Sequence, residues 1–74
     1  MRAPLCYGYK EDKWVATVTA WVQRSLGWDE PYALWEMGSR PDICIALIDV
    51  FPSIRAAKDH WRRINGLGTR WRPA

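Results

Sequence analysis

The sequence has few of the residues that bind metals or carry out acid–base chemistry. Its one histidine is His60, and its two cysteines, Cys6 and Cys44, lie far apart with no cysteine or histidine at ligand spacing. No metal site is therefore expected. Both cysteines are expected to be buried or idle thiols, with one disulfide as the alternative. His60 lacks a local partner for general-base chemistry, so a structural role is expected.

The short patterns that carry enzyme chemistry are also missing. Gly66 and Gly68 follow an expected helix and do not open one, so they form no phosphate-binding loop. Ser53 has no base at a motif spacing. Asp49 is expected on an exposed strand face or beside an arginine of the following helix, with a buried acid as the alternative. The sequence predicts a protein that is not an enzyme and binds no cofactor.

No transmembrane run, signal peptide or transit peptide is evident, which predicts a cytoplasmic protein without membrane contact. With 74 residues the chain is expected to form a single compact domain, 1–74, near the lower size limit for a stable core. Six tryptophans, three tyrosines and one phenylalanine offset the small size, because each ring buries a large area.

Positive charge is concentrated in the last quarter of the chain. Residues 1–54 contain five Lys/Arg and seven Asp/Glu, a net charge of −2, whereas residues 55–74 contain six and one, a net charge of +5. A basic segment of this kind indicates an acidic partner, either nucleic acid or an acidic protein surface. The simpler interpretation is a solvated helix face followed by a basic tail.

The N-terminal part is expected to form strands. Residues 5–9 and 14–22 are rich in β-branched and aromatic side chains and flank a charged turn at 10–13. A helix over 14–26 is the alternative, because apolar residues also recur there at helical spacing and Gly27 stands where a helix would end. The density of valine and threonine favours the strand.

The middle of the chain shows three shorter patterns. Residues 31–37 fit a short helix that begins near Pro31, or a strand entering a hairpin, and 38–42 is typical of a loop. Residues 43–51 (ICIALIDVF) form the most hydrophobic run, and their length and β-branching predict a central strand.

A helix is predicted over residues 53–65, with Ser53 as its N-cap and Asn65-Gly66 at its end. Its expected core stripe is Ile54, Ala57, Trp61 and Ile64. The other side carries Arg55, Asp59, Arg62 and Arg63, with Asp59 four residues from both Arg55 and Arg63.

The chain closes on residues 69–73 (TRWRP), which are expected to form a last strand. Successive side chains of a strand point to opposite faces, so Trp71 would enter the core while Arg70 and Arg72 both point outward. The predicted fold class is α+β, a small antiparallel β-sheet with one main helix (residues 53–65) packed on it and a closing C-terminal strand.

Three short motifs together resemble the small RNA polymerase inhibitor family of short-tailed (podovirus) bacteriophages. Residues 13–18 (KWVATV) look like the opening strand of that family. Residues 52–57 (PSIRAA), with the later Trp61, are similar to its capped helix. Residues 69–73 (TRWRP) are similar to its closing strand, which carries Thr-Arg-x-Arg-Pro. The resemblance covers roughly 13–73 and is interrupted by the segment 24–42.

The resemblance implies a phage protein of the host bacterial cytoplasm that binds the jaw region of the RNA polymerase β′ subunit and blocks transcription initiation. The paired arginines of the family carry over to Arg70 and Arg72. The helix departs from the family pattern, because it is basic here and acidic in the family. The expected partner-binding residues are Arg70, Arg72, Trp71, Arg62 and Arg63, and a monomer is expected.

The residues support the same site without the family, because a guanidinium binds carboxylates bidentately, and tryptophan and arginine are enriched at binding hot spots. Exposed aromatics among Trp21, Trp28, Trp35 and Trp71 are expected to supply its apolar centre. Two alternatives stay open. One is a nucleic-acid-binding module that uses the basic C-terminal helix and tail. The other is a phage inhibitor of a host defence complex of the CRISPR type.

Overall fold

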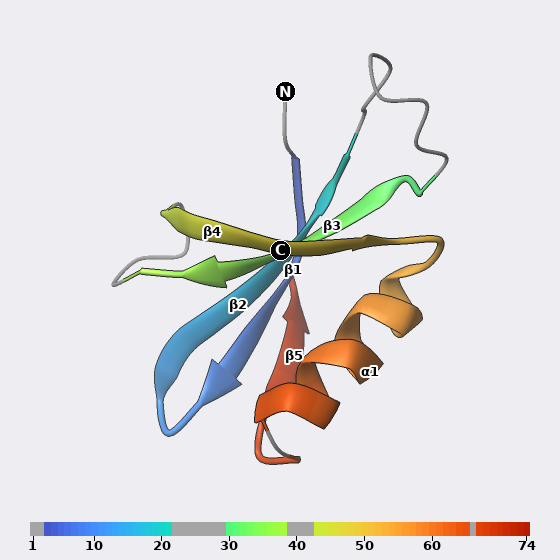
Figure 1. The fold of residues 1–74 in the computed structure, drawn as a ribbon. Helices are drawn as coiled ribbons and strands as arrows, with labels where there is room; N and C mark the ends of the chain where they lie inside the picture. Colours follow the sequence, from blue (N-terminus) through green and yellow to red (C-terminus); the bar gives the residue numbers. More distant parts are fainter. Residues whose placement is uncertain (1–2, 22–29, 39–42, 66) are drawn as a thin grey trace.

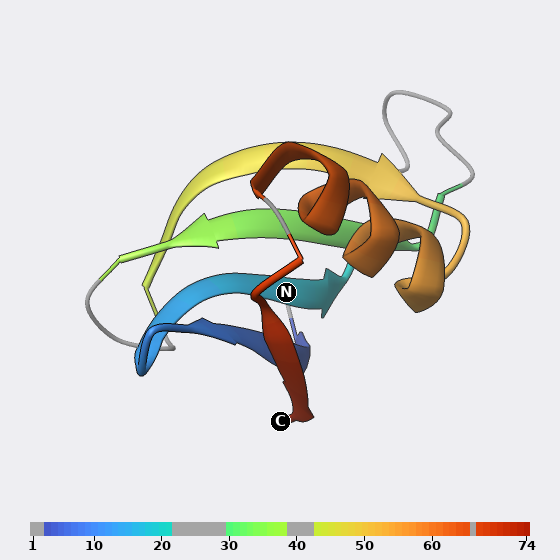
Figure 2. The ribbon, with the colours of Figure 1, turned by 90° about the horizontal axis from the view of Figure 1, so that it is seen from below.

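The computed structural model describes residues 3–21, 30–38, 43–65 and 67–74, which form one antiparallel sheet and one helix (Figure 1). The elements in chain order are β1 (Ala3–Lys10), β2 (Lys13–Ala20), β3 (Tyr32–Met37), β4 (Cys44–Phe51), α1 (Ile54–Asn65) and β5 (Arg70–Pro73). The strand order is β4-β3-β2-β1-β5, and the sheet curves past the helix, which lies on one of its faces (Figure 2). The predicted α+β fold with a closing strand is confirmed.

The β1–β2 hairpin turns on two charged residues. Lys10 pairs with Lys13, which leaves Glu11 and Asp12 as the two turn residues, with φ of 52° and 61°. Positive φ at both central positions is the geometry of a type I′ turn, whose twist matches that of the flanking strands. The tight turn fixes where β2 begins, so the strand interpretation of this segment is confirmed for residues 13–20 and the helical one is wrong there.

Residues 32–37 form a strand and not the short helix that Pro31 also allowed. β3 pairs with β2 on one side and β4 on the other, and its Ala33, Leu34 and Trp35 are all buried. Three consecutive buried residues need cover on both faces, which a central strand has and a surface helix lacks. The expected loop at 38–42 lies outside the described residues except for Gly38.

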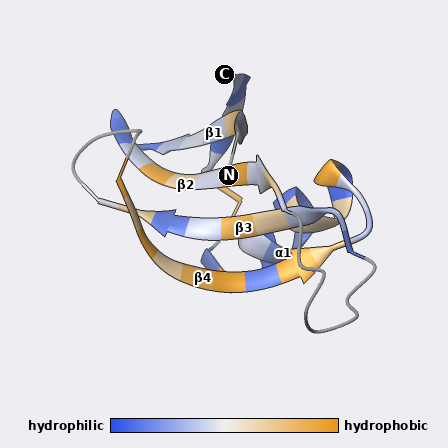
Figure 3. Cartoon of the chain, turned by 90° about the horizontal axis from the view of Figure 1, so that it is seen from above, coloured by the Kyte–Doolittle hydropathy of each residue, from blue (hydrophilic) through white to orange (hydrophobic). Residues whose placement is uncertain are grey.

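The hydrophobic run of β4 was predicted to be a central strand, and this was wrong. β4 is an edge strand that pairs with β3 alone, and two register irregularities interrupt the pairing. Ile45 is 63% exposed, and Ile43 and Leu47 are also exposed. Figure 3 shows the hydrophobic colour along most of this outer strand. A continuous apolar run indicates a strand, but it does not tell how many neighbours the strand has.

Helix α1 begins and ends where the sequence predicted. The Ser53 hydroxyl accepts a hydrogen bond from the Ala56 N–H at 3.1 Å, and at the other end the Lys10 ammonium donates to the Asn65 carbonyl at 2.7 Å. Ala57 and Trp61 are buried against β2, β3 and β4. Ile64 was expected in the same stripe but is 60% exposed, and Trp61 is the last buried residue of α1.

The core lies between α1 and the sheet. It contains Cys6, Ala16, Val18, Leu34, Ala57 and Trp61, with Ile48, Phe51, Ile54 and Trp71 among the partly buried residues packed against it. The opposite face of the sheet is also partly closed, since the Trp35 indole N–H donates to the Thr19 hydroxyl at 2.9 Å and Trp21 packs on Trp35.

The two cysteines are thiols, as expected. Cys6 lies on β1 and Cys44 on β4, three inter-strand spacings of roughly 4.8 Å apart. The register also places Cys6 level with Asp49 of β4 and not with Cys44, which separates the two cysteines further along the strands. A disulfide requires less than about 7 Å between Cα atoms. Among the described residues, no helix has the length and apolar character needed to span a membrane.

Candidate protein-binding surface

The TRWRP segment is bound to the rest of the molecule on two sides. As β5 it pairs with β1, with Arg72 opposite Tyr7, Trp71 opposite Gly8 and Arg70 opposite Tyr9. Thr69 is buried, and its hydroxyl accepts a hydrogen bond of 2.9 Å from the Trp61 indole N–H of α1. The arginines therefore stand on a strand that is anchored to both the sheet and the helix.

Trp71 points to the helix side, as predicted. It packs against the core, and the absence of a side chain at Gly8 makes room for its ring: a Cβ at Gly8 would lie 3.3 Å from two ring carbons of Trp71. The ammonium of Lys58 lies 5.9 Å above the ring centre. Trp71 therefore holds β5 in place and is not on the same face as the arginine pair.

Arg70 and Arg72 are both exposed and lie on the face of the sheet away from α1, because alternate residues of one strand share a face. The guanidinium of Arg72 lies 4.7 Å from the ring centre of Tyr9, which in turn packs on Trp14 at 3.8 Å. Trp14 also meets Tyr7 edge-to-face at 4.9 Å. We call this set the arginine face: Tyr7, Tyr9, Trp14, Arg70 and Arg72.

Neither arginine of this face has an ion-pair partner within the part of the chain that the structure describes. The stacked ring of Tyr9 covers one face of the Arg72 guanidinium and leaves its N–H edges available. The surface thus presents one guanidinium held against a ring and a second, exposed guanidinium on the same strand face, and each guanidinium can bind a carboxylate bidentately.

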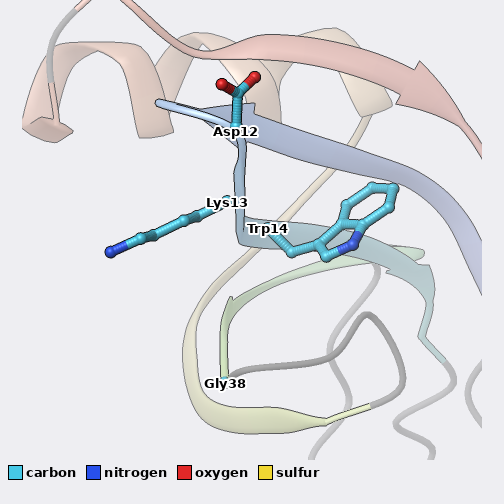
Figure 4. A pocket seen from close by; sticks show the side chains of 4 residues that line it. All are labelled: Asp12, Lys13, Trp14 and Gly38. Carbon is cyan, nitrogen blue, oxygen red and sulfur yellow. The ribbon is translucent and has the colours of Figure 1, made fainter.

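A hollow of about 390 Å³ lies at the end of the β1–β2 hairpin, beside Trp14. It is lined by Asp12, Lys13, Trp14 and Gly38 (Figure 4). In Figure 4, Lys13 and Trp14 extend in different directions from the start of β2, and Gly38 comes from the end of β3. Lys13 is exposed, so the hollow joins an aromatic wall to a further cation.

The other two expected partner-binding residues, Arg62 and Arg63, are on α1 and so belong to the opposite side of the sheet from Arg70 and Arg72. Asp59 pairs with Arg62 at 3.7 Å, and not with Arg55 or Arg63 as the four-residue spacing predicted. An i,i+3 pair is as accessible on a helix surface as an i,i+4 pair. The structure therefore divides the predicted site into two surfaces.

The side chains that could act in catalysis or bind a metal make ordinary packing and hydrogen-bond contacts. His60 packs on Phe51 with ring centres 5.0 Å apart, and Asp49 is exposed, its carboxylate accepting a hydrogen bond from the Val50 N–H. Burial raises the pKa of the Cys6 thiol above its ordinary value of 9.0, with the charge of Lys58 acting in the opposite direction. No cluster of potential metal ligands occurs among the residues with described positions.

The rings beside the arginines are not those of the three described tryptophans that were expected to supply the apolar centre. Trp35 is buried, Trp71 faces the helix, Trp21 packs on Trp35, and Trp28 lies outside the described residues. The rings beside the arginines come from the first hairpin instead. The alternation Tyr7-Gly8-Tyr9 was the available signal, since it places two tyrosines on one face of a strand and an open position on the other.

Comparison with protein-family models, with curated proteins and with solved structures found no match for this chain.

Proposed function

We propose that this protein is a phage-encoded inhibitor that binds bacterial RNA polymerase, at the jaw region of the β′ subunit, through Arg70 and Arg72. The observation that supports it best is the presentation of these two exposed guanidiniums on one face of an anchored strand, without ion-pair partners in the described part of the chain. The choice of polymerase as the partner rests on the resemblance of residues 13–18, 52–57 and 69–73 to the phage inhibitor family.

The arginine face suits carboxylates better than stacked bases. Single-stranded nucleic acids bind to open aromatic faces, on which successive bases stack. Here the ring of Tyr9 already contacts both Arg72 and Trp14, and all three aromatic rings of the face are at most half exposed. An acidic protein surface needs only the guanidinium edges, which remain available.

Holding the arginines in place before binding raises affinity. An arginine loses side-chain freedom when it becomes part of an interface, at a cost of about 0.5–1.5 kcal/mol. The Arg72–Tyr9 contact meets part of this cost in the unbound protein. Loss of a central interface arginine commonly costs 2 kcal/mol or more, which is roughly a 30-fold loss of affinity.

The test measures binding of the purified protein to bacterial RNA polymerase holoenzyme on a sensor surface, together with promoter-dependent transcription. Arg70→Ala/Arg72→Ala is expected to weaken binding by at least about 30-fold and to abolish inhibition. Arg70→Lys/Arg72→Lys keeps the charge but loses the bidentate fork, and is expected to bind nearly as weakly. Arg55→Ala removes an exposed charge from α1 and is expected to bind normally.

Four results would contradict the proposal. A lack of binding between the wild-type protein and polymerase would show that polymerase is not the partner. Full binding by the lysine variant would mean that positive charge alone, and not the guanidinium fork, accounts for the binding. Steep loss of binding with salt, together with capture of nucleic acid, would favour the nucleic-acid alternative, because phosphate contacts release counterions. Capture of a defence complex in place of polymerase would favour the remaining alternative.

A further inference from the structure

The end of α1 carries apolar surface that the fold leaves uncovered. Ile64 is 60% exposed and Leu67, just after the helix, is 88% exposed. Arg62 and Arg63 directly precede Ile64 in the sequence. We call Arg62, Arg63, Ile64 and Leu67 the helix-end surface. Two exposed aliphatic side chains beside two arginines differ from the isolated exposed leucine found on any protein.

This surface is hollowed. Asp59, Arg62, Arg63 and Leu67 line an open depression of about 480 Å³. One lining side chain is aliphatic, two are cationic and one is acidic, so the net charge of the lining is positive and the depression can receive an apolar side chain whose neighbours carry negative charge. The pocket that fits a partner's anchor side chain is the usual centre of a protein interface.

The electrostatics of the surface favour an acidic occupant. Asp59 offsets part of the charge of Arg62 through an exposed ion pair of 3.7 Å, but no ion pair involves Arg63 among the described residues. The C-terminal end of a helix is normally negative and would repel an acid. Lys10 donates to the Asn65 carbonyl there, which adds a positive charge at this point.

We propose that the helix-end surface is a second docking site, which binds an acidic protein segment that inserts an apolar side chain against Leu67. Nucleic acid fits less well, because phosphates need cations and gain nothing from Ile64 and Leu67. The site lies on the helix side of the sheet, whereas Arg70 and Arg72 lie on the other side. It therefore does not depend on the proposed binding to polymerase, and the molecule can hold two partners at once.

The test uses two synthetic acidic peptides of equal charge, a glutamate-rich sequence with a single central leucine and the same sequence with serine in place of that leucine. The leucine peptide is expected to bind wild-type protein about tenfold more tightly, the effect of burying one aliphatic side chain. Leu67→Ser is expected to abolish this preference, and Arg63→Gln to weaken both peptides severalfold. Because Leu67 is 88% exposed, its replacement does not disturb folding.

Two control variants make the outcome decisive. Ile45→Ser removes a matched exposed aliphatic from β4, and Arg70→Ala/Arg72→Ala removes the other cationic surface; both are expected to retain the preference for leucine. A preference that survives Leu67→Ser, or that disappears in Ile45→Ser, would overturn the proposal. Displacement of the leucine peptide by a single-stranded oligonucleotide at equal charge concentration would assign the surface to nucleic acid instead.

Discussion

At the scale of single residues, Gly8 determines how β5 docks. A side chain there would meet Thr69 at 3.0 Å and the Trp71 ring at 3.3 Å, both of which are held by other contacts. The two residues that Gly8 makes room for flank Arg70, so the glycine acts on the arginine face from the opposite side of the sheet.

We expect Gly8→Val to destabilise the protein by about 1–3 kcal/mol, the usual cost of overpacking a close contact. Chemical denaturation followed by tryptophan fluorescence measures it. Gly68→Ala is the matched control, because the nearest atom to its Cβ is the flexible Lys10 Cε at 3.8 Å, and little change is expected. Equal stability of the Gly8→Val variant would mean that β5 is not packed on β1 as described.

A second residue-scale prediction concerns Cys6. Burial raises the pKa of its thiol in the folded protein, so above the ordinary value of 9.0 the unfolded chain has lost a proton that the folded one keeps. The contribution of Cys6 to stability is therefore complete below pH 9.0 and decreases as the pH rises from there through the raised pKa. The free energy of unfolding should decrease less steeply above pH 9.0 in Cys6→Ala than in wild type. Parallel curves for the two proteins would contradict this prediction.

At the scale of elements, the turn of the first hairpin holds two side-chain-bearing residues in the left-handed region. Glu11 and Asp12 both have positive φ, a conformation that costs side-chain-bearing residues roughly 1 kcal/mol and glycine much less. This turn sets the start of β2 and hence the place of Trp14 on the arginine face.

Asp12→Gly should therefore raise the free energy of unfolding by about 0.5–1 kcal/mol, as measured by thermal or chemical denaturation. Asp12→Ala removes the same charge but keeps a Cβ in the left-handed region, so it should not stabilise. If both variants stabilised equally, the effect would come from the lost carboxylate and not from the backbone.

At the scale of the whole molecule, the exposed edge of β4 is the feature that most favours aggregation in solution. Its outer residues from Ile43 to Ile48 include no charge, and unpaired apolar edges promote association between molecules. Along this strand, the exposed carboxylate of Asp49 and the two register irregularities oppose such association.

Ile45→Lys should slow aggregation during heating or concentration, with unfolding free energy changed by no more than about 0.5 kcal/mol, because the side chain is 63% exposed. Light scattering at matched concentration checks this. Leu67→Lys adds the same charge away from the edge. An equal benefit from that variant would attribute the effect to net charge rather than to β4.

The sequence predicted local features well and neighbour relations poorly. The Ser53 cap, the end of α1 at Asn65 and the inward turn of Trp71 follow from local chemistry, and all are confirmed. The edge position of β4 and the exposure of Ile64 depend on which strands lie alongside and how far the sheet extends. The contact of Arg72 with the Tyr9 ring depends on the pairing of β1 with β5, which no local pattern encodes.

The pairing of β1 with β5 also affects the order in which parts of the protein fold. β1 and β5 come from opposite ends of the described chain, so their contact requires closing the longest loop in the fold, and contacts of high sequence separation form slowly. The arginine face forms only after β5 has paired with β1 and the Thr69 hydroxyl has accepted its hydrogen bond from the Trp61 indole. Molecules in which β5 has not yet paired with β1 lack the arginine face, so binding through this face, followed during refolding, should report when that pairing forms.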